Sequence, residues 1–311
     1  MMMLIASAAV LTACSSEDPI ENAYNYLDPG MLGPGGDMMP GGAGGASAGT
    51  GEMLTFEVAL DKTTVEPAST VTAYYPETAD DVSKQTFATQ VTIDMANPVA
   101  KTENGVEITV TNGHVTANHG STTGVCYVVS GTTSNGSLTI DGKTDFMINL
   151  NDADINNPTS TALDLESKGA AYLVLTGTNK LMDGSAEDHK STLYSKGKLL
   201  VSGTGALEVY GVYNNGIHSK SYVLFEKGIN LYVNAANHGI KGSDAIINGG
   251  IINVETDGDG AKGINCDYNI TINGGRTNVV CTGDGEWDTE DLETKASSCI
   301  KCDSGLTIKG G

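Results

Sequence analysis

Short runs of alternating hydrophobic and polar residues recur from about residue 105 to the end of the chain. The segment 229–233, Ile-Asn-Leu-Tyr-Val, places its aliphatic side chains on one face, as is typical of a β-strand with one buried side. A second short strand is expected around 239–241 and a third around 245–248, where the chain reaches a pair of glycines. The pattern predicts three short strands and three turns in each repeat.

The repeat has a period in the low twenties, and its hydrophobic positions align from one unit to the next. The aligned residues are Leu193, Ile217, Ile240, Ile264 and Ile300, at spacings of 24, 23, 24 and 36, and Val209, Val233, Val254 and Val279, at spacings of 24, 21 and 25. Units of this length with several strands are typical of a solenoid, whereas a β-propeller, the main alternative, needs about 40–50 residues per blade. We therefore predict an all-β parallel β-helix over 87–311, with ladders of aliphatic side chains inside it.

Glycine pairs mark the turns between the predicted strands. The pairs are Gly249-Gly250, Gly274-Gly275 and Gly310-Gly311. Each is expected where the backbone needs a positive φ or a close approach of another chain segment. Asn248 and Asn273 precede two of the pairs, so their side-chain amides are expected to stack. Because the pattern stops in mid-repeat, we expect the natural chain to continue past the last glycine.

The N-terminal region has the features of an exported and tethered protein. Residues 1–13 form an apolar run that is too short to span a membrane, and its end, Leu-Thr-Ala-Cys, resembles a bacterial lipobox in which Cys14 would be lipidated. Residues 14–51 form the predicted flexible tether, with ten glycines and three prolines within 29–51. Residues 52–86 are expected to form an irregular segment or cap. We expect a lipid-anchored protein at the bacterial outer membrane or cell surface.

Charge limits the range of partners. The chain has 38 acidic and 17 basic residues, for a formal net charge of −21. Nucleic acids and anionic membrane surfaces require basic patches, so neither is an expected direct partner, and contact with a membrane is expected only through the lipid anchor. No nucleophile-elbow, P-loop or dinucleotide-binding motif is present in the sequence.

The segments ALDLESKG, STLYSKGKLLVSGTGALEVYG, YNNGIHSK and ANHGIKGSD resemble a family of bacterial cell-surface, carbohydrate-binding, right-handed β-helix proteins. The resemblance covers residues 87–311 and implies a fold similar to that of pectate lyases. It also implies binding of calcium and of plant polysaccharides such as cellulose and polygalacturonate. The acidic turns Asp257-Gly258-Asp259-Gly260 and Gly283-Asp284-Gly285 match the family pattern, whereas His238 stands where an Asp is usual.

The acidic turns are the candidate calcium site. Asp284 lies 25 residues after Asp259 and is expected one rung above it, where the two carboxylates would repel each other unless a cation lay between them. Calcium accepts six to eight oxygen ligands in flexible geometry. The candidate ligands are Asp257, Asp259, Asp284, Glu286 and Asp288, with Glu290, Asp291, Glu293, Asp267 and Asp303 as further options. The alternative is a solvated acidic loop.

Three functions are consistent with these features. The first is non-catalytic binding of cellulose or an acidic, pectin-type glycan with calcium, in which metal ions would bridge like charges and Trp287 would offer an aromatic contact. The second is a calcium-dependent pectate-type lyase with Lys241 or Lys262 as the base, which would require that the lysine be desolvated. The third is a structural or adhesive surface spacer.

The cysteines carry less information. Cys266 and Cys302 fall at matching positions of neighbouring repeats, close enough to pair or to stack. Cys126, Cys281 and Cys299 complete the set beyond residue 14 and, like that pair, are interpreted as small core residues.

Overall fold

A computed structural model describes residues 66–67, 70–185, 188–289 and 292–311. The predicted leader (1–13), Cys14, the tether (14–51) and the first part of the predicted N-terminal segment lie outside these residues. Within the described part of the chain, no helix is long and apolar enough to cross a membrane.

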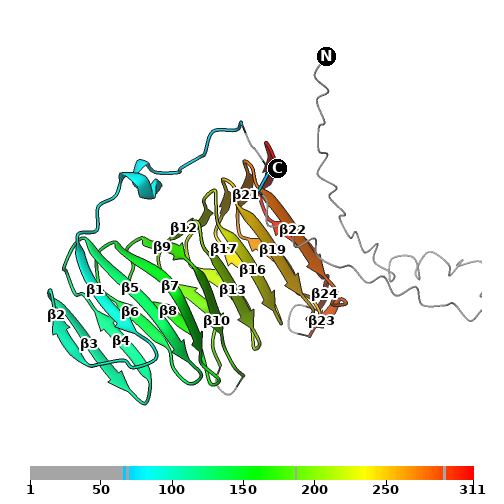
Figure 1. Cartoon of the computed structure of the whole chain (residues 1–311). Coiled ribbons are helices and arrows are strands. Elements are labelled where there is room, and N and C mark those ends of the chain that lie inside the picture. The colour runs from blue at the N-terminus through cyan, green and yellow to red at the C-terminus, as the bar shows by residue number, and fades with distance from the viewer. Residues whose placement is uncertain (1–65, 68–69, 186–187, 290–291) are drawn as a thin grey trace, which may run out of the picture. The chain divides into compact units, whose positions relative to one another are not determined.

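The chain winds into a parallel β-solenoid of about seven turns (Figure 1). Each complete turn adds one parallel strand to each of three faces, which we name faces 1, 2 and 3 in the order in which each turn from β8 onward passes through them. Faces 2 and 3 are joined in one sheet through β7. Face 1 contains β4 (His114–Asn118), β6 (Leu138–Asp141), β8 (Leu163–Leu165), β11 (Ser191–Ser195), β14 (Asn215–Ser219), β17 (Ile240–Gly242), β20 (Lys262–Cys266) and β25 (Ser298–Cys302). Face 2 contains β1 (Thr89–Asp94), the first parts of β5 (Val125–Thr133) and β7 (Phe146–Asn156), β9 (Ala171–Thr176), β12 (Leu199–Gly203), β15 (Val223–Phe225), β18 (Ala245–Ile247), β21 (Asn269–Ile272) and β26 (Gly305–Ile308). Face 3 contains the remainders of β5 and β7, then β10 (Thr178–Met182), β13 (Ala206–Gly211), β16 (Asn230–Ala235), β19 (Ile251–Thr256) and β22 (Arg276–Cys281).

Antiparallel strands occur at two places. At the N-terminal end, β2 (Lys101–Glu103), β3 and β4 form an antiparallel meander that extends the sheet of face 1, with β3 spanning Val106–Thr111. Near the C-terminal end, β23 (Glu286–Asp288) and β24 (Glu293–Lys295) form a hairpin within the long turn between β22 and β25.

The ladders predicted from the repeat are confirmed. On face 1, Leu193 is paired with Ile217, then Ile240, Ile264 and Ile300 follow on successive rungs. On face 3, Val209, Val233, Val254 and Val279 are aligned in the same way. These side chains point inward and form part of one continuous apolar core. The hairpin insertion lengthens one repeat to 36 residues without changing the register, because it lies in a turn.

The turns at the first two of these glycine pairs have the predicted geometry. Gly250 and Gly275 have φ angles of 86° and 82°, in the region that favours glycine. A Cβ atom on Gly275 would lie 2.4 Å from the carbonyl oxygen of Gly250, so both conformation and space require glycine there. The Asn273 side-chain amide donates to Asn248 Oδ1 at 2.9 Å, and both side chains are buried, which confirms the expected amide stack.

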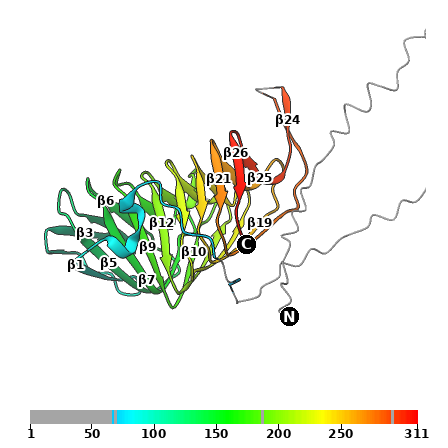
Figure 2. The ribbon, with the colours of Figure 1, turned by 90° about the horizontal axis from the view of Figure 1, so that it is seen from above.

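Residues 70–87, which we call the strap, lie along the outer surface of face 2 (Figures 1 and 2). The strap contains two 3₁₀ helices, η2 (Thr78–Asp80) and η3 (Val82–Lys84). It covers a stripe of outward-facing apolar side chains that are register partners on successive rungs: Tyr172, Leu200, Leu224 and Ile246. The described part of the segment predicted as irregular therefore packs along the side of the solenoid. The first strand, β1, begins two residues after the predicted start of the β-helix at residue 87.

Candidate carbohydrate-binding groove

A stripe of polar side chains runs along the outside of face 1. Because side chains alternate across a strand, each residue that follows an inward-facing ladder residue points outward. The stripe consists of Asp164, Tyr194, His218, Lys241, Asn265 and Lys301, which are register partners from β8 to β25. At about 4.8 Å per rung, the five intervals give a length of about 24 Å.

Turns that lead from face 3 to face 1 border this stripe and form two hollows. The first has a volume of about 480 Å³ and lies between the turn that leads into β8 and the residues His189 and Lys190 before β11. The second, of about 580 Å³, lies between the last rungs of face 1 and the β23–β24 hairpin. Its lining includes His238, Lys262, Asn265 and Lys301 from the solenoid, and Glu286 from the hairpin. The insertion thus provides one wall of the second hollow.

Lysines are concentrated around the stripe, although the whole chain is strongly acidic. The lysines on the strands of face 1 or directly beside them are Lys190, Lys196, Lys220, Lys241, Lys262, Lys295 and Lys301. The pKa of His218 falls to about 4, first because burial desolvates the imidazole and then because of Lys241, Lys190 and Lys220. Burial lowers the pKa of His238 to about 3, with Lys241 and Lys262 adding to the effect. Both imidazoles are neutral at pH 7, so the positive charge here comes from lysines.

Lys262 is the most enclosed of these lysines. It is only 8% exposed, its ammonium group donates to the Gly260 carbonyl, and its own backbone N–H donates to His238 Nδ1 at 3.2 Å. Burial lowers the pKa of Lys262, and Lys301 and Lys295 lower it further, whereas Glu286 acts in the opposite direction. The desolvation that a lysine base requires, which the sequence did not reveal, is therefore present at Lys262.

Asp164 lies at the other end of the stripe. Its Oδ1 atom is buried and has no hydrogen-bond partner in the described part of the chain. Burial raises the pKa of Asp164 to about 6, and Glu166 contributes to the rise, whereas Lys190 and Lys196 oppose it. Glu166 itself forms an ion pair with Lys196 at 2.6 Å. One end of the stripe thus contains a carboxylate that is poorly solvated and whose negative charge is only weakly balanced by the nearby lysines.

The predicted calcium ligands lie near one another but do not converge. Asp284 is one rung from Asp259, as expected, and its backbone N–H donates to Asp259 Oδ1 at 2.9 Å. The side chain of Asp257 is exposed, and that of Asp288 forms an ion pair with Lys295. Among the residues that the structure describes, no three or more His, Cys, Asp or Glu side chains are placed to hold a metal ion. The residues present do not fit an assembled site, and calcium binding stays a prediction from the sequence.

Trp287 is 55% exposed and is paired with Thr294 in the β23–β24 hairpin. It lies in the hairpin that walls the second hollow, but it is not among the residues that line that hollow. Cys266 and Cys302 are register partners on face 1, as expected from their matching positions, and both are free thiols.

Sequence reasoning identified Lys241 and Lys262 on this face but missed Asp164, Tyr194, His218, Asn265 and Lys301 as members of one stripe. A signal for them is present in the sequence. Each residue follows a ladder position by one, so the stripe has the same spacing as the aliphatic ladder that was recognised.

Comparison with known proteins supports the fold and the class of ligand. A polysaccharide lyase-like protein from C. thermocellum, solved as a gadolinium derivative, matches with a TM-score of 0.51 and 21% sequence identity, over 70% of this chain and 96% of that protein. At that identity the match supports the fold alone. No match was found among curated proteins. The model of a family described as carbohydrate-binding domain-containing proteins matches residues 104–285, which include most of faces 1, 2 and 3. The chain therefore belongs to the carbohydrate-binding domain-containing protein family.

Proposed function

We propose that the protein binds an acidic polysaccharide along the stripe on face 1. The observation that carries this proposal is the concentration of lysines around Lys241, Asn265 and Lys301 on an otherwise acidic chain. Membership of the carbohydrate-binding family supports a polysaccharide as the partner, and the local charge favours one that carries carboxylates. A stripe of polar side chains that extends across successive rungs, with a hollow near each end, suits an extended chain of sugars better than a single sugar.

The local charge matters more than the net charge because salt screens distant charges. The Debye length is about 8 Å at physiological ionic strength, which is less than two rungs of the solenoid. A uronate carboxylate held beside Lys241 therefore interacts mainly with the nearby charges. In the second hollow these are Lys262, Lys295 and Lys301 against Glu286 and Glu293, so the lysines are in excess. No bridging metal ion is needed to overcome the net charge of −21 in this arrangement.

Replacing both Lys241 and Lys301 by alanine should weaken binding of hexagalacturonate roughly tenfold or more. The reason is that each lysine contributes a charge-assisted contact worth about 1 kcal/mol or more. Isothermal titration calorimetry at two salt concentrations measures the loss and should show a steeper salt dependence for the wild type. Lys84→Ala, which removes an exposed lysine of the strap, is the matched control and should bind like the wild type. Equal affinity of the double variant and the control would contradict the proposal.

A second candidate function is polysaccharide lyase activity, which is favoured by one observation, the burial of Lys262 in the second hollow. A desolvated lysine can remove the proton beside a uronate carboxylate. Release of unsaturated product from polygalacturonate, followed by its ultraviolet absorbance and lost in Lys262→Met, would favour this activity. Binding without product favours the binding function, and no retention on any glycan would leave a surface spacer.

Calcium binding in the acidic turns is tested separately, with terbium as a luminescent substitute. Trp287 is the only tryptophan of the chain and lies within the acidic insertion, so a terbium ion bound there should be sensitised by excitation of Trp287. Calcium should compete for this signal. Replacing Asp257, Asp259 and Asp284 together by alanine should reduce the signal several-fold, because oxygen ligands determine affinity for such ions. Replacing Asp94, which lies at the end of β1 and is not a candidate ligand, is the control. An unchanged signal in the triple variant would remove this site.

The N-terminal sequence features support the proposal that this function is carried out at a cell surface. The lipobox-like sequence at Cys14 and the glycine-rich segment that follows it support a lipid-anchored module held at a distance from the membrane. Under this proposal, the groove on face 1 captures plant-type polysaccharide outside the cell.

A further inference from the structure

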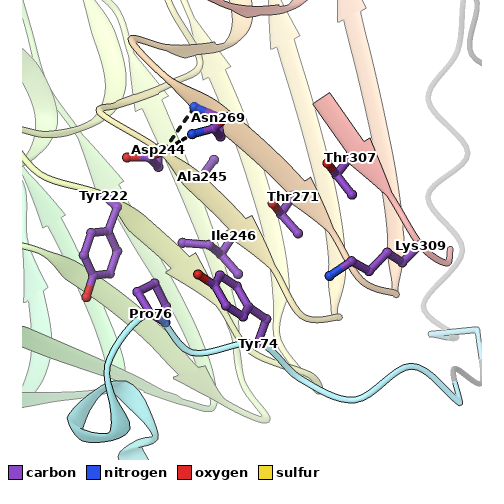
Figure 3. Close-up of a pocket in the computed structure, with 10 residues that line it drawn as sticks. All are labelled: Tyr74, Pro76, Tyr222, Asp244, Ala245, Ile246, Asn269, Thr271, Thr307 and Lys309. Carbon is purple, nitrogen blue, oxygen red and sulfur yellow. Dashed lines mark hydrogen bonds between the residues drawn. The ribbon is translucent and has the colours of Figure 1, made fainter. Parts of the chain in front are cut away.

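Face 2 has a groove of its own (Figure 3). It lies on a different face of the solenoid from the lysine stripe. The groove has a volume of about 570 Å³ and lies between the strap and the last rungs of face 2. This volume is within the range of about 300–1,000 Å³ that is usual for small-ligand sites.

The floor of this groove is formed where the outward-facing residues of face 2 change from apolar to polar. Ile246 is the last of the apolar residues, and its register partners on the next two rungs are Thr271 and Thr307. Both threonines are at least partly exposed, and their side chains line the groove beyond the area that the strap covers. The floor therefore offers an apolar patch followed by two hydroxyl groups.

Tyr74 of the strap forms one wall and is held rigidly. Its backbone N–H donates to Asn248 Oδ1 at 2.8 Å, and its carbonyl accepts from the Asn248 side-chain amide at 3.1 Å. The side chain is 47% exposed, so the ring is available although the backbone is fixed. An exposed aromatic ring on a fixed backbone is a suitable stacking surface for the apolar face of a sugar ring.

The remaining polar groups of the groove have balanced charge. Asp244 Oδ1 accepts from the backbone and the side-chain amide of Asn269, at 3.0 and 3.2 Å. On the other side, the Lys309 ammonium group lies 5.7 Å from the centre of the Tyr74 ring (Figure 3). With one carboxylate and one ammonium group, the groove lacks the excess of positive charge seen on face 1.

We infer that the groove on face 2 is a second saccharide site, which takes an uncharged sugar ring stacked on Tyr74 and hydrogen-bonded to Thr271 and Thr307. The inference extends the proposed function, since it adds a site with a different ligand charge. With two such sites on separate faces, one molecule can hold an acidic and a neutral polysaccharide at the same time.

The test measures binding of cellohexaose, as the uncharged probe, and of hexagalacturonate, as the charged probe, to the same set of variants. Tyr74→Ala should weaken cellohexaose binding about tenfold through loss of stacking, and leave hexagalacturonate binding unchanged. Thr271→Val keeps the shape of the floor and removes a hydroxyl group, so it should weaken cellohexaose binding about fivefold. Tyr268→Ala removes a tyrosine that is 57% exposed outside the groove and should have no effect on either probe.

The two probes separate this inference from the proposed function. Loss of hexagalacturonate binding in the Lys241 and Lys301 double variant, with cellohexaose binding retained, supports two independent sites. Failure of cellohexaose to bind the wild type overturns the inference and leaves the face 1 proposal standing. Cellohexaose binding that is unchanged in both Tyr74→Ala and Thr271→Val also overturns the inference. Thermal denaturation of each variant checks that the strap remains docked, and Thr271→Val provides the decisive result if Tyr74→Ala loosens it.

Discussion

Replacing Asp80 by alanine is expected to lower the free energy of unfolding by about 3 kcal/mol. The Asp80 side chain, at the end of η2 in the strap, is fully buried against the solenoid, where it accepts from the Lys198 ammonium group at 2.9 Å and from the Tyr222 hydroxyl at 2.7 Å. The Lys198 side chain is 18% exposed. Removing one partner of a buried ion pair costs about 3–5 kcal/mol because the other charge is left poorly compensated, and the second ion pair, with Glu77, places this case at the lower end.

The pKa of Lys198 indicates how strongly this network stabilises its charged form. Burial by itself lowers the pKa, but hydrogen bonds to Asp80 and Glu77 outweigh that effect and the pKa lies above its ordinary value. Guanidinium denaturation of the wild type, Asp80→Ala and Asp80→Asn measures the loss, and the isosteric Asn variant should be intermediate. Asp303→Ala breaks an exposed ion pair with Lys301 and should change stability by less than about 1 kcal/mol. If Asp80→Ala were no worse than this control, the strap would not be held by the buried pair.

Replacing Asp164 by asparagine is expected to stabilise the protein at neutral pH by about 1–2 kcal/mol. The pKa of Asp164 is raised from its ordinary value of 3.8 to about 6, first by burial and then by Glu166. Each unit of pKa shift corresponds to about 1.4 kcal/mol, and residual solvent contact reduces the full value. Above pH 6, folding therefore keeps an ionised carboxylate in a poorly solvated place. Asparagine has nearly the same shape and no charge.

The sign of the pH dependence follows from this shift. Well below its ordinary pKa of 3.8, Asp164 is protonated in both the folded and the unfolded protein, so its cost is absent. Between pH 4 and 6 the folded protein binds the extra proton, and above pH 6 the cost is fully present. The stability difference between Asp164→Asn and the wild type should therefore grow from near zero at about pH 3 to its full value at about pH 7. Parallel denaturation curves across this range measure it, and a constant difference would contradict the assigned shift.

The repeat could be recognised from sequence because each turn of the solenoid contacts the turn before and after it. Ile217 and Ile240 are 23 residues apart in sequence and directly opposite each other in the sheet, so regular spacing is sufficient to align them. The same reasoning placed Asp284 one rung from Asp259. It could not establish how the exposed carboxylates are oriented, because no packing constraint fixes a solvated side chain. The arrangement of the predicted calcium ligands was therefore beyond the reach of the pattern.

The apolar stripe under the strap can be recognised in the sequence. In β12, β15 and β18, the outward positions Leu200, Leu224 and Ile246 are apolar as well as the inward ones. Strands that are apolar on both sides are typically covered on both faces. That pattern indicates that something covers face 2 at these rungs, but it does not say which segment does so.

The sequence by itself determined the coiling of the chain, the inward ladders, the turns and the rung on which each residue lies. These features depend on contacts about one repeat apart, which a periodic pattern records directly. Only the tertiary structure decided where the strap docks, because Tyr74 and Asn248 are 174 residues apart and nothing periodic connects them. It also decided that lysines from separate turns gather around one face and that Lys262 is desolvated, since burial depends on the turns and the hairpin that surround each side chain. The function proposed here relies on both, with the repeat providing the scaffold and the packing between distant segments providing the two grooves.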